Sequence, residues 1–181
     1  MTASAAPLLS RSTESTCSPV INGNYSTHIA TAFNTRSAWK YVGSGEGSNG
    51  DYPVDTQVTD VGTMDPNPPG TDLTVSQWYG ANAQYRIGVG KFNGVETCLG
   101  GRDDRIYGLD CDSALAAWTI TCDACSSNDG SQAGICSFQA TQVGTCATFT
   151  GSGQAMNLTE CLPIDGENPD VYYQTNQQFI F

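Results

Sequence analysis

Basic side chains are scarce in this sequence. Seven Lys and Arg residues stand against eighteen Asp and Glu, which gives a net charge of −11, and there is a single histidine, His28. Such a charge repels phosphate backbones and anionic lipids, so we expect neither nucleic-acid binding nor membrane binding. Ser-His-Asp and Cys-His catalysis would both depend on His28, which we expect to pack or to lie on the surface. The sequence therefore predicts that the protein is not an enzyme.

Long apolar runs and helical periodicity are also missing. No apolar stretch approaches the roughly 20 residues that a membrane helix needs, and no apolar period of 3.6 residues persists beyond two turns. Gly, Ser, Thr, Asn and Asp interrupt the chain every few residues instead. The short apolar segments between them contain alternating, β-branched or aromatic residues, as strands do. We therefore predict an all-β fold of many short strands.

Cysteine, by contrast, is abundant. Eight cysteines occur in 181 residues, a density typical of disulfide-rich proteins from oxidising compartments. The Ala-Ser-Ala at 3–5 is typical of the end of a signal-peptidase site, and Asn24 and Asn157 each begin an Asn-x-Ser/Thr acceptor for N-glycosylation. We predict a secreted glycoprotein, with residues 1–16 as a disordered arm or a signal or propeptide remnant and residues 17–181 as one domain.

A short aromatic pattern recurs along the chain. Each copy has an aromatic residue followed two positions later by an apolar or aromatic one, and such a pair lies on one face of a strand. The aromatic positions are therefore expected to fill the interior of a barrel. The four copies are centred on Trp39, Tyr85, Trp118 and Phe179.

One segment resembles a repeat of a known family. Cys98-Leu99 opens it, Leu109-Asp110-Cys111 follows, and a strand around Trp118 closes it, with alanine at 116 where the family has glutamine. This resembles one repeat of a ricin-B-type β-trefoil, and residues 17–181 as a whole are similar to the secreted ricin-B-like proteins of mushroom-forming fungi. The resemblance implies a disulfide-stapled β-trefoil, which is a barrel of six strands capped by three hairpins.

The resemblance also bears on the cysteines. It implies a disulfide between Cys98 and Cys111 and another between Cys146 and Cys161. The pairing of the other four cysteines stays open. The Cys-x-x-Cys motif at 122–125 lacks further zinc ligands in a chain with one histidine, so we expect no metal and no cofactor. The four cysteines of unassigned partner are Cys17, Cys122, Cys125 and Cys136.

In the family, an aspartate two residues after the first cysteine of a repeat and an asparagine three before its closing aromatic hold a sugar. The corresponding residues here are Gly100 and Leu115, which cannot make those hydrogen bonds. In the last repeat the aspartate position is Thr148, but the asparagine is retained. Any sugar site is therefore expected in that repeat, formed by Asn176 and Gln177 with the aromatic pair Tyr172 and Tyr173, whose flat faces suit stacking.

The family implies several non-catalytic roles. The favoured hypothesis is a lectin-like accessory or stabilising subunit that docks on a larger extracellular glycoprotein or on the large subunit of a secreted oxidase such as a laccase. The alternative is a carbohydrate-binding lectin with one surviving site in the last repeat. A third hypothesis is a protease inhibitor that acts through the proline-rich segment 65–72. The fold alone does not decide among them.

Overall fold

The computed structural model describes residues 16–32, 37–41, 54–58, 73–78, 84–92, 94–125, 134–151, 154–162 and 176–180. The predicted arm at 1–16 lies outside these residues except for Thr16. The described chain is built of short strands and one 3-10 turn. In order these are β1 (Asn24–Thr27), β2 (Ala30–Thr31), β3 (Ser37–Tyr41), β4 (Val54–Val58), β5 (Leu73–Gln77), β6 (Gln84–Phe92), β7 (Val95–Arg102), β8 (Arg105–Asp110), η1 (Ala114–Ala116), β9 (Trp118–Cys122), β10 (Cys136–Ala140), β11 (Cys146–Thr148), β12 (Asn157–Thr159) and β13 (Phe179–Ile180).

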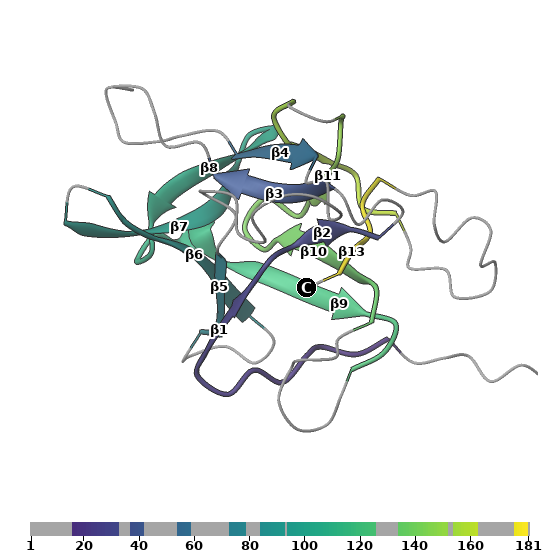
Figure 1. Ribbon diagram of the computed structural model, residues 1–181, viewed down its shortest axis with the longest axis horizontal. Coiled ribbons are helices and arrows are strands. Elements are labelled where there is room, and N and C mark those ends of the chain that lie inside the picture. The colour runs from purple at the N-terminus through teal and green to yellow at the C-terminus, as the bar shows by residue number, and fades with distance from the viewer. Residues whose placement is uncertain are drawn as a thin grey trace, which may run out of the picture.

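The strands form a β-trefoil, as the sequence predicted. All described pairings are antiparallel, and they run in the order β1-β5-β6-β7-β8-β12-β11-β10-β13-β2-β3-β4. Strand β9 pairs with both β6 and β10, which lie far apart along that path, so the sheet closes on itself. Closure through β9 leaves β1 and β4 as the two ends of the path of paired strands. Figure 1 shows β6 and β7 projecting from the barrel as a long hairpin.

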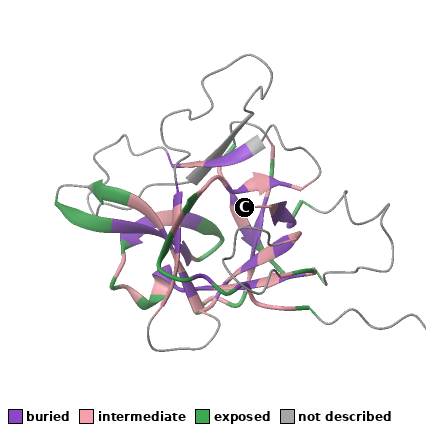
Figure 2. Ribbon diagram, turned by 60° about the horizontal axis from the view of Figure 1, so that its bottom comes forward, coloured by how far each residue is buried: buried purple, intermediate pink, exposed green. Residues whose placement is uncertain are grey.

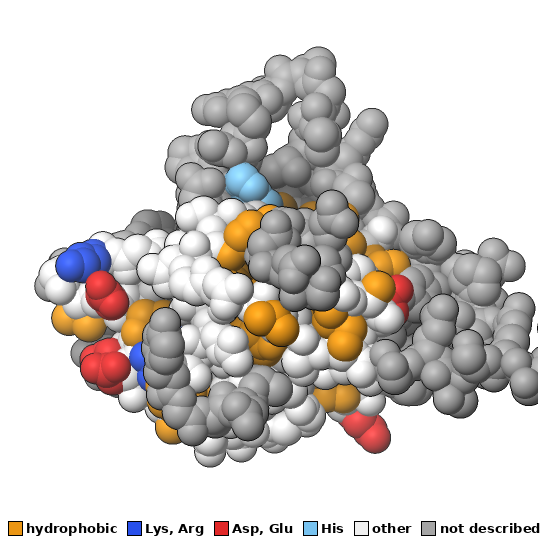
Figure 3. Space-filling view, turned by 90° about the horizontal axis from the view of Figure 1, so that it is seen from below, with side chains coloured by type: hydrophobic (Ala, Val, Ile, Leu, Met, Phe, Trp, Pro, Cys, Tyr) orange, Lys and Arg blue, Asp and Glu red, His pale blue; other side chains and the backbone are white. Residues whose placement is uncertain are grey.

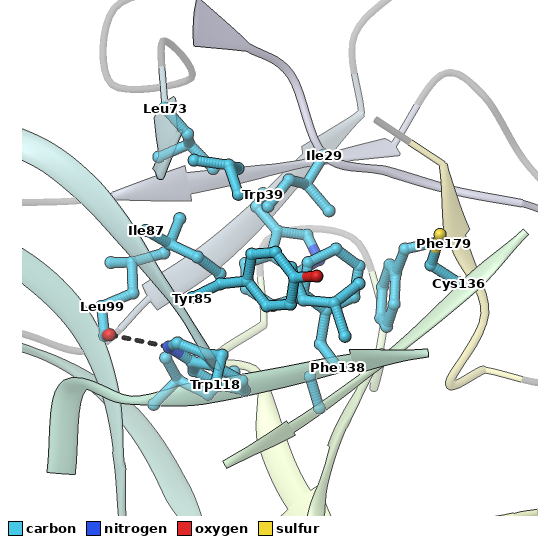
Figure 4. Packing of buried hydrophobic residues seen from close by; sticks show 14 of the residues in the cluster. Ile29, Trp39, Leu73, Tyr85, Ile87, Leu99, Trp118, Cys136, Phe138 and Phe179 are labelled. Atoms are coloured by element: carbon cyan, nitrogen blue, oxygen red, sulfur yellow. Dashed lines mark hydrogen bonds between the residues drawn. The ribbon is translucent and has the colours of Figure 1, made fainter. Parts of the chain in front are cut away.

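The four aromatic residues of the recurring pattern lie in the core, as predicted. Trp39, Trp118 and Phe179 are fully buried and Tyr85 is 1% exposed. Each lies on a different strand, so segments far apart in the sequence meet inside the barrel (Figure 4). Trp39 contacts the other rings at centroid distances of 5.9 Å to Trp118, 5.2 Å to Phe138 and 5.2 Å to Phe179. Such tilted and edge-on pairs stabilise beyond their buried area.

Two buried polar atoms of these rings have partners in the backbone. The Trp118 indole Nε1 donates to the Leu99 carbonyl oxygen at 2.8 Å, which ties β9 to β7 (Figure 4). The Tyr85 hydroxyl donates to the Pro19 carbonyl oxygen and so fixes the chain before β1. Burial raises the pKa of the Tyr85 phenol, because the charged form would lose its hydration.

Four disulfides staple the barrel. Cys98–Cys111 joins β7 to the end of β8, and Cys146–Cys161 closes the equivalent loop later in the chain, so both pairings implied by the resemblance are present. The structure assigns the four remaining cysteines as Cys17–Cys125 and Cys122–Cys136. The first of these spans 108 residues and is aided by backbone bonds between Cys17 and Cys122, so it anchors the start of the fold to β9. In the described part of the chain, no helix is long and apolar enough to cross a membrane.

Candidate functional site

The sugar position of the repeat that contains Cys98 is packed shut. A Cβ atom on Gly100 would lie 2.5 Å from the Leu115 carbonyl oxygen, 2.6 Å from Leu109 Cδ1 and 3.0 Å from Ala116 Cα. The turn η1 sits directly against β7 here, and Ser113 caps it by accepting a hydrogen bond from the Leu115 amide at 3.3 Å. There is therefore no space for an acidic side chain at position 100.

We expect Gly100→Asp combined with Leu115→Asn to destabilise the protein and not to create a sugar site. Inserting side-chain atoms into a filled core costs about 1–3 kcal/mol, and a buried carboxylate adds to that. Denaturant unfolding measures the loss. The matched control is Gly88→Ala, whose added Cβ would meet nothing nearer than 3.6 Å. This substitution is expected to leave the free energy of unfolding nearly unchanged. Sugar binding gained by the double variant would contradict this account.

In the last repeat, the side chain of Gln177 lies inside the fold. Gln177 is 3% exposed. Its Nε2 donates to Thr159 Oγ1 at 2.7 Å, to the Glu160 carbonyl oxygen at 2.8 Å and to Thr148 Oγ1 at 3.0 Å, while its Oε1 accepts from the Leu162 amide at 2.8 Å. These bonds tie the chain before β13 to the β11–β12 hairpin, and they leave the amide no group to offer a ligand.

The expected sugar contact of Gln177 is therefore corrected to a structural role. Thr148 at the aspartate position is also buried, 5% exposed, and its hydroxyl lies 2.7 Å from Thr159 Oγ1. Asn176 is exposed, and its main-chain carbonyl oxygen accepts a hydrogen bond from the Phe149 amide at 2.7 Å. Tyr172 and Tyr173 lie outside the described residues. The structure describes two of the four residues expected at this site, and of these two Asn176 is exposed to solvent and Gln177 is buried.

A second site, which the sequence analysis did not identify, lies on the outer face of β1, β5, β6 and β7. The structure contains a cavity of about 460 Å³ there, within the range of small-molecule sites. Polar, glycine and aromatic residues form it, with one disulfide at its side. We call this cavity the outer-face pocket, and its residues include Asn24, Thr74, Ser76, Trp78, Arg86, Gly88, Gly90, Lys91, Glu96 and the Cys98–Cys111 disulfide.

Strand register explains why these side chains meet. Ser76 of β5 lies opposite Asn24 of β1 on one side and opposite Arg86 of β6 on the other. Trp78, two residues beyond Ser76, faces the same way, because alternate residues share a face, and its amide continues the pairing by donating to the Gln84 carbonyl oxygen at 2.8 Å. Leu73 and Val75 point the opposite way, into the core. One alternating strand therefore serves both the core and the outer-face pocket.

Arg86 is held in a fixed position in this pocket. Its guanidinium carbon lies 4.3 Å from the centroid of the Trp78 ring, a cation–π contact. Its Nη1 lies 3.4 Å from Asp112 Oδ1, and the Arg86 side chain is 15% exposed while that of Asp112 is 98% exposed. So exposed an ion pair contributes little to stability. Its effect is to orient the guanidinium, which presents donors in a planar fork.

The far end of the pocket is formed by a distorted part of the β6–β7 hairpin. The register shifts between Gly88 and Gly90, which marks a bulge, and Gly90 has a φ of +104° that a residue with a side chain rarely adopts. Beyond this bulge, the Lys91 Nζ atom lies 4.0 Å from Glu96 Oε1. The hairpin tip is exposed while its base is buried (Figure 2). In Figure 3 the cationic side chains on the face shown lie at the left with carboxylates beside them, on the side from which the hairpin projects.

The sequence contained a signal for this pocket. Residues 73–76 alternate apolar and polar, and Trp78, two residues after Ser76, is the one tryptophan that the recurring aromatic pattern does not include. An aromatic residue in phase with the polar positions of a strand faces outward. What the sequence could not supply was the pairing that places Arg86 and Asn24 beside it, because register is a property of the folded sheet.

The remaining expected sites are distributed as follows. Asn24 is exposed on β1, whereas Asn157 is half-buried on β12, which pairs on both sides. His28 is partly buried between β1 and β2 and does not line the outer-face pocket. Among the described residues, no group of three His, Cys, Asp or Glu side chains is placed to hold a metal ion.

Comparisons with known proteins establish the fold. No family model matches the sequence, and no curated protein matches it. Among solved structures, the chain is similar to Polyporus squamosus lectin bound to the human-type influenza-binding epitope Neu5Aca2-6Galb1-4GlcNAc, with a TM-score of 0.56 and 15% identity over 89% of this chain and 49% of that one. The chain thus spans about half the length of that lectin.

A second similar structure is the cytolethal distending toxin of Haemophilus ducreyi, with a TM-score of 0.51 and 11% identity over 85% of this chain and 80% of that one. At these identities the similarity shows the fold, a β-trefoil, and no particular activity.

Proposed function

We propose that this chain is a non-catalytic, lectin-like protein that acts outside the cell by binding a glycan, free or attached to a larger glycoprotein. The outer-face pocket is the observation on which this proposal rests. It combines an aromatic ring, hydroxyl and amide side chains and an oriented guanidinium, the mixture of stacking surface and hydrogen-bonding groups that suits a sugar ring. The similarity to a lectin bound to a glycan supports the same assignment.

The composition of the pocket supports a binding role over catalysis. Among the described residues that line the pocket, Glu96 is the one carboxylic acid, and it lies beside Lys91. Glycoside hydrolysis commonly needs two carboxyl groups placed across the scissile bond. The four disulfides support an extracellular location, because such bonds persist in oxidising compartments.

We also propose a partner that carries the glycan. The resemblance favours the large subunit of a secreted fungal oxidase such as a laccase, on which this chain would act as an accessory subunit. Native purification tests this, since an oxidase chain that co-elutes at fixed stoichiometry supports it and elution of the chain alone contradicts it. The segment 65–72 invoked for protease inhibition lies outside the described residues.

We expect Trp78→Ala to lower glycan affinity about tenfold, since loss of a stacking ring worth roughly 1.4 kcal/mol corresponds to that factor. A glycan array identifies the ligand and calorimetry then measures its dissociation constant. Both parent and variant carry Ser26→Ala, which removes the N-glycosylation acceptor sequence at Asn24. The array includes acidic sugars, because a carboxylate would meet Arg86. Asn176→Ala is the matched control and is expected to bind as the parent does. Binding that vanishes with Asn176 and survives Trp78→Ala would move the site to the last repeat.

A further inference from the structure

One glycosylation acceptor lies inside the outer-face pocket. Asn24 lines the cavity and is exposed. It lies opposite Ser76, and Trp78 is its diagonal neighbour on the same face of the strand pair. Diagonal neighbours are about 7–8 Å apart, a span that a sugar ring attached to the asparagine amide can cover. A glycan on Asn24 therefore begins within reach of the Trp78 ring and of the Arg86 guanidinium stacked on it.

We propose that the N-linked glycan of Asn24 folds back over the outer-face pocket and occupies it, so that the protein is capped by its own sugar. This inference rests on the proposed function, because it assigns the same pocket to carbohydrate. The occupant is the first N-acetylglucosamine with its next sugars. An external glycan then binds only in competition with it, which makes trimming of the Asn24 glycan a means of opening the site.

Tethering makes this occupancy favourable even for a weak site. A ligand on a short flexible linker has an effective concentration in the millimolar range. A pocket with a millimolar dissociation constant is then occupied about half of the time by the attached sugar. Free sugar at micromolar concentration would hardly compete. The position of β1 adds a second effect, since it ends the path of paired strands and a bulky sugar there protects an edge from pairing with another chain.

The second acceptor provides an internal contrast. Asn157 lies between β11 and β8, opposite Thr148 and Arg105, and does not line the pocket. A glycan on Asn157 is present equally in a protein that lacks only the Asn24 acceptor. Ser26→Ala creates such a protein, because it destroys the acceptor sequence and leaves Asn24 itself in place. Ser26 is exposed and is not part of the pocket lining.

The tryptophans allow a direct test. The chain has three, and Trp39 and Trp118 are fully buried, so acrylamide quenching of fluorescence reports Trp78. Wild type and Ser26→Ala are secreted from one eukaryotic host, and mass spectrometry measures sugar on the Asn24 peptide. We expect Asn24 to be modified and the quenching constant of the wild type to be about half that of Ser26→Ala, as half-occupancy requires. An unmodified Asn24, or equal quenching of the two proteins, overturns the inference.

Binding of external glycans separates this inference from the proposed function. Cis occupancy predicts that Ser26→Ala binds a soluble glycan more tightly than the wild type does. Equal affinity of the two proteins overturns the inference and leaves the proposed function standing. A shielded Trp78 in the wild type together with no binding of any external glycan by Ser26→Ala supports the cap and overturns the proposed function.

Discussion

Trp118→Ala is expected to lower the free energy of unfolding by about 3–5 kcal/mol, the largest effect of any single substitution considered. The side chain is fully buried, it contacts Trp39, and its indole donates to the Leu99 carbonyl oxygen. Truncation removes the packing, leaves a cavity and removes a buried hydrogen bond. In a chain of this length the melting temperature should fall by roughly 10 °C. Calorimetry or denaturant unfolding measures both quantities.

Trp78, the tryptophan of the outer-face pocket, provides the matched control. Trp78→Ala removes the same side chain from a partly exposed position, where less apolar area returns to water, so it should cost clearly less. Trp118→Phe should lie between the two, because a ring is kept in the core while the hydrogen bond and part of the packing are lost. Equal destabilisation by Trp118→Ala and Trp78→Ala would show that the core is not built around Trp118.

Gln177→Ala is expected to destabilise the protein by about 3 kcal/mol, because a buried side chain that makes four hydrogen bonds is removed and each such bond contributes about 0.5–1.5 kcal/mol. The Leu162 amide, the Thr148 hydroxyl and the Glu160 carbonyl oxygen all bond to this one side chain. The β11–β12 hairpin and the chain before β13 should separate first, which hydrogen exchange measures as faster exchange of the amides at 146–148 and 157–159.

The control for this prediction is the preceding residue. Asn176 is exposed, and its carbonyl bond to the Phe149 amide is kept in Asn176→Ala, so we expect little change in stability. A neutral Gln177→Ala would return Gln177 to the list of candidate sugar ligands. If Gln177→Ala lowered stability strongly but left hydrogen exchange of the amides at 146–148 and 157–159 unchanged, that would contradict the role of Gln177 in joining the β11–β12 hairpin to β13.

The fold could be predicted because it depends on local and repeated signals. Alternating residues, frequent turns and recurring aromatics define short strands and their inward faces, and the residues around Cys98 and Cys111 resemble one repeat of a known fold. The buried positions of Trp39, Trp118 and Phe179 follow from that pattern. The second pair of disulfides could not be deduced in the same way, because four cysteines without a repeat partner admit several pairings.

The candidate site was harder to predict for a physical reason. A motif that marks a sugar site assumes that its polar side chains face solvent. In this chain Gln177 lies inside the fold, where Thr148 and Thr159 satisfy its amide, and Gly100 lies under η1. The outer-face pocket depends instead on cross-strand register, with Asn24, Ser76 and Arg86 in one row. Such a row joins residues that are distant in sequence, so no local motif reveals it.

Titration of the Ser26→Ala protein with a glycan from the array, followed by tryptophan fluorescence, tests whether the outer-face pocket binds carbohydrate. Trp78 is the tryptophan that is not fully buried, so binding in the outer-face pocket should change the emission saturably, with the dissociation constant found by calorimetry. The change should disappear in Trp78→Phe. Calorimetric binding with unchanged emission, or no glycan binding at all, would contradict the account of this pocket as the carbohydrate site.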